Sequence, residues 1–133
     1  MPSTNLRMLS AVLIAFGLTF CMIYPLSIIW PSGWAWQNGA AAMSDQFMII
    51  IGVYAVLGIS MILASRDPAA STSLIWFVVW SSLVHALIAG WEAMRSPMMK
   101  GHFYGDVPAL LLAAIVLGSL MSRGVTAEAG ATA

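Results

Sequence analysis

Residues 46–64 read QFMIIIGVYAVLGISMILA, a run without a single charged side chain. An α-helix rises about 1.5 Å per residue, so this run covers the roughly 30 Å of a bilayer's hydrocarbon core. Three more apolar segments accompany it, at residues 6–24, 73–94 and 107–121. The last segment is short and needs an extra turn or a locally thinner bilayer to span it. The sequence therefore predicts an all-α fold, an integral membrane four-helix bundle.

The composition of the whole chain also indicates a membrane protein. Hydrophobic residues make up 61% of the 133 residues and charged residues 8%, whereas soluble domains carry about 25% charged residues. The five basic and five acidic residues are scattered singly, which indicates neither nucleic-acid binding nor a polybasic patch for lipid. We expect residues 1–133 to form one membrane domain, with a disordered tail at about 124–133.

The connections predict where the chain leaves the bilayer. Pro31-Ser32-Gly33 ends the first helix, and the loop that follows, to residue 45, carries tryptophans typical of the headgroup region: Trp30, Trp34 and Trp36. The tight turn at residues 65–68 predicts that the second and third helices form an antiparallel hairpin. Gly52, Ala55 and Gly58 form a small-residue surface that another helix can approach closely.

Lysine and arginine predict the orientation. With the N-terminus inside, the inner side carries three arginines, Arg7, Arg66 and Arg123, and the outer side carries Arg95 and Lys100. The first outer loop has no basic residue. We therefore expect a multi-pass protein with both termini in the cytoplasm.

His85 is the most informative single residue, because the third helix places an ionisable imidazole near the bilayer midplane. Ser81 and Ser82 lie one helical turn before His85 and Glu92 lies two turns after it, which gives a polar stripe on the same side. This stripe predicts either a polar pocket, where His85 could relay protons, hold a ligand or coordinate a metal, or a hydrogen bond that only joins helices. His102 is expected at the surface, too far from His85 for a two-histidine metal site.

A second polar cluster is expected at the outer mouth, which the start of the second helix could join through Asp45 and Gln46. Its members are Glu92, Arg95, Lys100, His102 and Asp106. His102 and Asp106 could approach each other across the start of the fourth helix, where Asp106 before Val107-Pro108 is typical of an N-cap. The cluster could bind a divalent cation or a headgroup, or it could be a solvated network that fixes the loop. The single cysteine, Cys21, excludes an intrachain disulfide, and no cofactor is predicted.

Three stretches resemble a family of uncharacterised small bacterial membrane proteins: Ser73-Leu74-Ile75-Trp76-Phe77, Trp80-Ser81-Ser82-Leu83-Val84-His85-Ala86 and Gly105-Asp106-Val107-Pro108-Ala109-Leu110. The layout is also similar to that of the DoxX-like four-helix membrane proteins. The resemblance covers residues 45–122 and implies a bacterial inner membrane, a four-helix bundle, and His85 and Asp106 as motif positions without a known role.

Three functional hypotheses follow. The first is a non-enzymatic accessory or assembly component, bound to other membrane subunits or to itself, because the sequence contains no nucleotide, metalloprotease or nucleophile motif. The second is a protein that handles a small molecule, a lipid or protons in a pocket around His85 and Glu92. The third is a redox subunit that binds haem or a divalent metal, which would require a second ligand besides His85.

Overall fold

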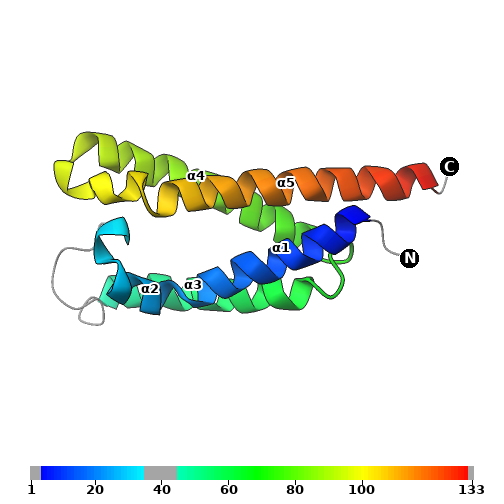
Figure 1. Cartoon of the computed structure of the whole chain (residues 1–133), viewed down its shortest axis with the longest axis horizontal. Coiled ribbons are helices and arrows are strands. Elements are labelled where there is room, and N and C mark those ends of the chain that lie inside the picture. Colours follow the sequence, from blue (N-terminus) through cyan, green and yellow to red (C-terminus); the bar gives the residue numbers. More distant parts are fainter. Residues whose placement is uncertain (1–3, 35–44, 132–133) are drawn as a thin grey trace.

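The computed structural model describes residues 4–34 and 45–131, and within them it contains only helices and turns. The elements are α1 (Thr4–Cys21), α2 (Ile23–Ile29), the short 3-10 helix η1 (Pro31–Trp34), α3 (Asp45–Ala64), α4 (Thr72–Arg95), the 3-10 helix η3 (Pro97–Phe103) and α5 (Asp106–Ala131). Four segments of the described chain are long and apolar enough to cross a membrane: Thr4–Cys21, Asp45–Ala64, Thr72–Arg95 and Pro97–Gly124. The predicted all-α membrane bundle is confirmed, and the two ends of the chain lie at the same end of the bundle (Figure 1).

The first span is broken into α1 and α2, although the sequence predicted one helix over 6–24. The break falls at Met22, whose N–H is shared between the carbonyl oxygens of Leu18 and Thr19 at 3.0 and 3.1 Å. Pro25 explains the position, because it has no N–H to donate to Cys21 and its ring crowds that carbonyl. As expected, the helix does not continue beyond Trp30, whose N–H donates to the Leu26 carbonyl at 2.8 Å.

The fourth span is longer than predicted, and the disordered tail expected from residue 124 is wrong as far as Ala131. There α5 continues without interruption to Ala131. Alanine recurs in this segment and is the best helix former, and each added residue gains a hydrogen bond once the helix exists. A locally thinner bilayer is therefore not needed for this span.

The helices pack as two pairs, α1 with α3 and α4 with α5, and α1 joins the pairs through α5. Figure 1 shows α4 leaving α3 beyond the turn between them and lying along α5. The predicted hairpin of the second and third helices is therefore wrong in its packing: α3 and α4 share few contacts. The reason is that α3 uses its small residues against α1.

The closest approach of α1 and α3 is at Gly17 and Gly58. A Cβ atom on Gly58 would lie 2.5 Å from the Gly17 carbonyl oxygen, and a Cβ on Gly17 would lie 2.7 Å from that of Gly58. Ala55 also faces α1, where its carbonyl accepts the thiol of Cys21 at 3.6 Å. Gly52 has open space around it. Two of the three predicted small residues thus form the contact, and α1 is their partner.

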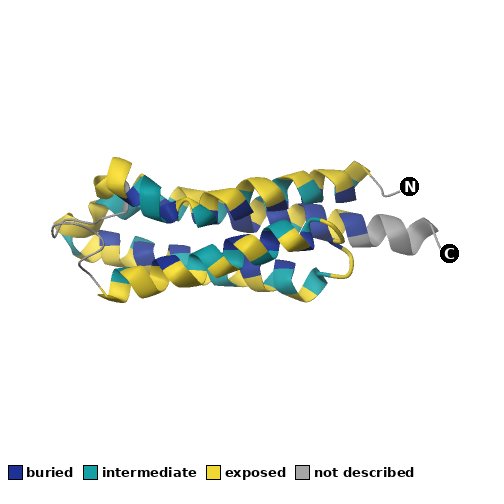
Figure 2. Cartoon of the chain, turned by 90° about the horizontal axis from the view of Figure 1, so that it is seen from below, coloured by how far each residue is buried: buried dark blue, intermediate teal, exposed yellow. Residues whose placement is uncertain are grey.

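The buried positions of the helices face the interior of the bundle and the exposed positions face outward (Figure 2). The fully buried centre includes Leu9, Leu13, Met61, Ile75, Leu117 and Met121. Large apolar residues such as Val56, Trp80 and Ile115 are exposed. In water such a surface would aggregate, but it suits hydrocarbon. Trp30 is also exposed, whereas the side chain of Trp34 and all of Trp36 lie outside the described residues.

Candidate functional site

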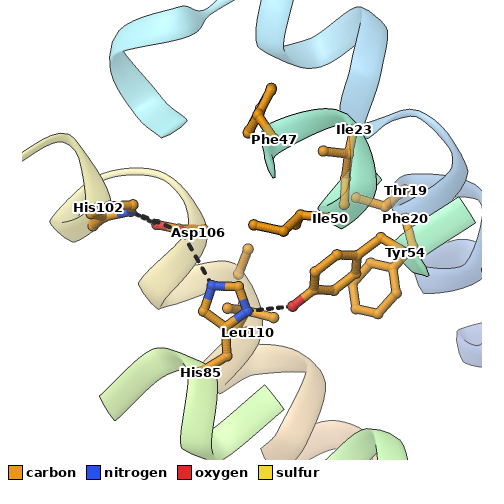
Figure 3. Close-up of a pocket in the computed structure, with 11 residues that line it drawn as sticks. Thr19, Phe20, Ile23, Phe47, Ile50, Tyr54, His85, His102, Asp106 and Leu110 are labelled. Carbon is orange, nitrogen blue, oxygen red and sulfur yellow. Dashed lines mark hydrogen bonds and ion pairs between the residues drawn. The ribbon is translucent and has the colours of Figure 1, made fainter. Parts of the chain in front are cut away.

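A cavity of about 180 Å³ lies between the two helix pairs, and polar groups gather on one side of it (Figure 3). Most of its wall is apolar and comes from α1, α2, α3 and α5: Phe20, Ile23, Phe47, Ile50, Ala109 and Leu110. The polar lining residues are Thr19, Tyr54, His85, His102 and Asp106. An apolar cavity with a few convergent polar groups is the usual form of a small-molecule site.

Asp106 is the centre of the polar side. It is the first residue of α5 and is 5% exposed. Its carboxylate accepts the Nδ1–H of His102 at 2.8 and 2.9 Å and the backbone N–H of Val107 at 3.1 Å. The positive end of the α5 dipole also favours a negative charge there. These donors compensate a carboxylate that would otherwise be costly to bury.

His102 reaches Asp106 because η3 folds back over the start of α5. The two residues are separated by one helical turn in sequence, and the His102 side chain is only 15% exposed. The predicted approach of His102 and Asp106 is confirmed. The expectation that His102 lies at the surface is wrong, because η3 turns its ring inward to line the cavity with His85.

His85 stands between Asp106 and Tyr54. Its Nδ1 is hydrogen-bonded to the Tyr54 hydroxyl, and its Nε2 faces Asp106 Oδ2 at 3.9 Å. The Tyr54 ring is held in turn by an edge-to-face contact with Phe20, with ring centroids 5.1 Å apart. Tyr54, His85, Asp106 and His102 thus form one polar chain across the bundle, called here the Tyr54–His102 chain (Figure 3).

The geometry suits a neutral His85 that carries its proton on Nε2. In that form Nδ1 accepts the hydroxyl proton of Tyr54 and Nε2–H points at the carboxylate. A separation of 3.9 Å exceeds a direct hydrogen bond. A hydroxyl oxygen can bridge it by accepting from Nε2–H and donating to Oδ2. One hydroxyl group that lies beside the line between Nε2 and Oδ2 can therefore join His85 to Asp106.

The other residues of the predicted polar stripe do not line the cavity. Ser82 is buried, and the Ser81 hydroxyl donates to the Val78 carbonyl within α4 at 3.2 Å. Glu92 is exposed and lies outside the lining. The face of α4 that carries His85 therefore turns away from the cavity before Glu92.

The outer-mouth cluster is also divided. Arg95 is exposed and lies over the ring of Trp91, 5.9 Å from its centroid. In the described part of the chain no ion pair joins it to Glu92. Nor do the described residues contain a group of three histidine, cysteine or acidic side chains placed to hold a metal ion. His102 and Asp106 are the members that reach the cavity.

Tyr54, the hydrogen-bond partner of His85, was not predicted from the sequence. A tyrosine hydroxyl in the middle of the most apolar segment needs a polar partner, because hydrocarbon offers none. That reasoning could have paired Tyr54 with His85. It could not have identified Phe20 and Phe47, which look like any lipid-facing aromatic residue in the sequence.

Comparison with known proteins agrees with the earlier resemblance to an uncharacterised family. No curated protein and no solved structure matches the chain. The family match extends over residues 3–133, so it includes the first helix and every residue of the Tyr54–His102 chain. This small helical membrane protein belongs to a family of unknown function, DUF6632.

Proposed function

We propose that this protein binds a small amphiphile within the membrane, with the hydroxyl head of the amphiphile between His85 and Asp106. The observation that carries the proposal is the 3.9 Å gap between Nε2 and Oδ2 at the polar side of an otherwise apolar cavity. The His85 side chain is 37% exposed while Asp106 is nearly covered. The imidazole is thus the more accessible group of the pair.

The cavity limits the size of the amphiphile. Its volume of about 180 Å³ is below the roughly 300 Å³ at which pockets for drug-sized ligands begin. A single ring or a short chain fills this space, and a longer apolar tail would have to extend into the bilayer. Phe20, Phe47 and Ile50 supply apolar contacts for the buried part.

The polar chain also supports proton exchange with the bound head. A hydroxyl in the gap would connect His85 to Asp106, and Asp106 already bonds to His102. Histidine can accept a proton on one ring nitrogen and release one from the other. The Tyr54–His102 chain can therefore pass a proton between the head of the amphiphile and η3, outside the long helices.

The two other functional hypotheses have less support. Membership of a larger complex or a homo-oligomer remains a proposal that no particular surface of the described residues favours. A haem or metal subunit would need a second ligand near His85. The Nδ1 of His102 donates to Asp106, so only Nε2 of that ring could bind a metal ion, and the described residues contain no group of three histidine, cysteine or acidic side chains placed to hold one. The bacterial inner membrane with cytoplasmic termini is our proposed location, supported by the arginine distribution.

The test uses a matched pair of probes, 4-fluorophenol and fluorobenzene, which differ by one hydroxyl group. Purified full-length protein in mild detergent is titrated with each probe, and the fluorine NMR line width is followed. We expect saturable binding of the phenol and at least roughly tenfold weaker binding of fluorobenzene, since a hydrogen bond to a charged group contributes about 1.5–3 kcal/mol.

The control variant is Asp106→Asn, which keeps the side-chain shape and removes the charge. It should reduce the preference for the phenol to a few-fold. Equal saturation by both probes in the unaltered protein would refute a hydroxyl site between His85 and Asp106.

A further inference from the structure

A second cavity lies at the opposite end of the bundle, near the chain termini, and two arginines line it. Its volume is about 230 Å³, and Arg7 of α1 and Arg66 of the turn after α3 both reach it. The remaining lining residues are Leu6, Ser10, Asp67, Pro68 and Ala69. The sequence showed no polybasic patch because these two charges are far apart along the chain. The fold brings them together.

Both guanidinium groups are available to a ligand. Arg7 and Arg66 are exposed, and neither forms an ion pair within the described residues. The one acid in the cavity, Asp67, already accepts the backbone N–H of Ala70 at 3.1 Å, which closes the turn. Two arginines and one aspartate leave the cavity with a net positive charge. Such a cavity favours an anion.

The cavity also has the surroundings of a lipid headgroup. Arg7 lies near the start of one apolar span, and Arg66 lies two residues beyond the end of another. Leu6 and Pro68 are buried and form an apolar side next to the charges. Guanidinium groups match phosphate oxygens with paired N–H donors. An anion that is continuous with an apolar chain satisfies both parts of the lining.

We propose that Arg7 and Arg66 bind the phosphate group of an anionic lipid headgroup. The site is separate from the cavity at His85, and neither proposal depends on the other. The phosphate would lie between the two guanidinium groups, with its acyl chains along the apolar surface of the bundle.

The experiment measures lipid retention by native mass spectrometry on the full-length protein in mild detergent. An equal mixture of phosphatidylglycerol and phosphatidylcholine is added. Both lipids carry a phosphate, but only phosphatidylglycerol has a net negative charge. We expect preferential retention of phosphatidylglycerol. The double variant Arg7→Gln/Arg66→Gln should weaken the binding of phosphatidylglycerol, relative to phosphatidylcholine, roughly thirtyfold. This is the effect expected for the loss of two arginines at an anionic surface.

Arg123→Gln is the matched control, because Arg123 is an exposed arginine of α5 that does not line the cavity. The preference of Arg123→Gln for phosphatidylglycerol should stay within about twofold of that of the unaltered protein. An equal loss in Arg123→Gln and in the double variant would overturn the site, since it would show an effect of overall charge. Equal retention of both lipids by the unaltered protein would overturn it as well.

Inorganic phosphate distinguishes the lipid from a soluble anion. If the lipid is the ligand, millimolar phosphate should not displace phosphatidylglycerol from the unaltered protein. Displacement at that concentration would assign the site to free phosphate and overturn the lipid proposal. Circular dichroism checks the fold of each variant. If the double variant fails to fold, Arg7→Lys/Arg66→Lys replaces it. This variant keeps both positive charges and should retain the preference for phosphatidylglycerol. Loss of the preference would contradict the charge argument.

Discussion

His102 and the buried Asp106 form a pair in which one ring N–H faces both carboxylate oxygens, at 2.8 and 2.9 Å. Removing the donor leaves the carboxylate with the Val107 N–H and a distant His85. We expect His102→Ala to lower the free energy of unfolding by about 1–3 kcal/mol, because a buried charged acceptor loses its main partner. Chemical unfolding of the purified protein in detergent, followed by circular dichroism, measures the change.

His102→Asn is the control for that substitution, because its amide N–H can occupy the place of Nδ1–H. His102→Asn should lower the free energy of unfolding by less than half as much as His102→Ala does. Equal losses would show that the ring packs in η3 without supporting the carboxylate.

The contact between Gly17 and Gly58 predicts a large difference between two glycines of one helix. Gly58→Ala places a methyl group 2.5 Å from the Gly17 carbonyl oxygen, so α1 and α3 must move apart. We expect a loss of about 1–3 kcal/mol in the free energy of unfolding, the usual cost of overpacking. Gly52→Ala meets nothing within 4 Å and should change stability by less than about 1 kcal/mol.

The measurement is the same unfolding experiment on both variants. If Gly52→Ala is as destabilising as Gly58→Ala, the close α1–α3 contact is not what limits the residue at position 58.

The sequence was sufficient to predict the four spans because hydropathy and helix length determine them directly. It could not predict which helices form pairs. The turn after α3 favoured a hairpin with α4, but the close contact at Gly17 and Gly58 links α3 to α1 instead. Small residues mark a surface that permits close approach, and they do not specify which helix approaches.

The candidate site was predicted in part for a similar reason. His85 was conspicuous, since an ionisable residue in an apolar segment is costly and needs partners. Asp106 was predicted as the N-cap of the fourth helix, close to His102. Glu92 seemed to belong with His85 because it lies two helical turns further along α4. The actual partner, Tyr54, comes from α3, and periodicity within one helix cannot show a contact between helices.

The bond between Tyr54 and His85 predicts a defined tautomer of the histidine ring. With Tyr54 donating to Nδ1, the proton of neutral His85 resides on Nε2. Nitrogen NMR of histidine-labelled protein should show this form in the unaltered chain. Tyr54→Phe should shift the population toward the other tautomer, because the donor to Nδ1 is lost.

The two histidines are assigned by comparison with His102→Ala, which removes the second ring signal. A predominantly Nδ1-protonated His85 in the unaltered protein would contradict the proposed direction of the hydrogen bonds.

Ala109 and Leu112 allow the binding role of the cavity to be tested without touching its polar groups. Ala109 lines the cavity, whereas Leu112, almost one helical turn later on α5, is 56% exposed and outside the lining. Ala109→Phe should place a phenyl ring in the cavity of about 180 Å³. Because this ring and the probe would occupy the same volume, the affinity for 4-fluorophenol should fall at least roughly tenfold. Leu112→Phe should bind the probe with an affinity within about twofold of that of the unaltered protein, because its ring faces outward.

Fluorine NMR titration measures both affinities, and unfolding curves confirm that the two variants are folded. If Ala109→Phe binds the phenol normally while Asp106→Asn does not, the hydroxyl group is recognised outside this cavity and the position assigned between His85 and Asp106 is wrong.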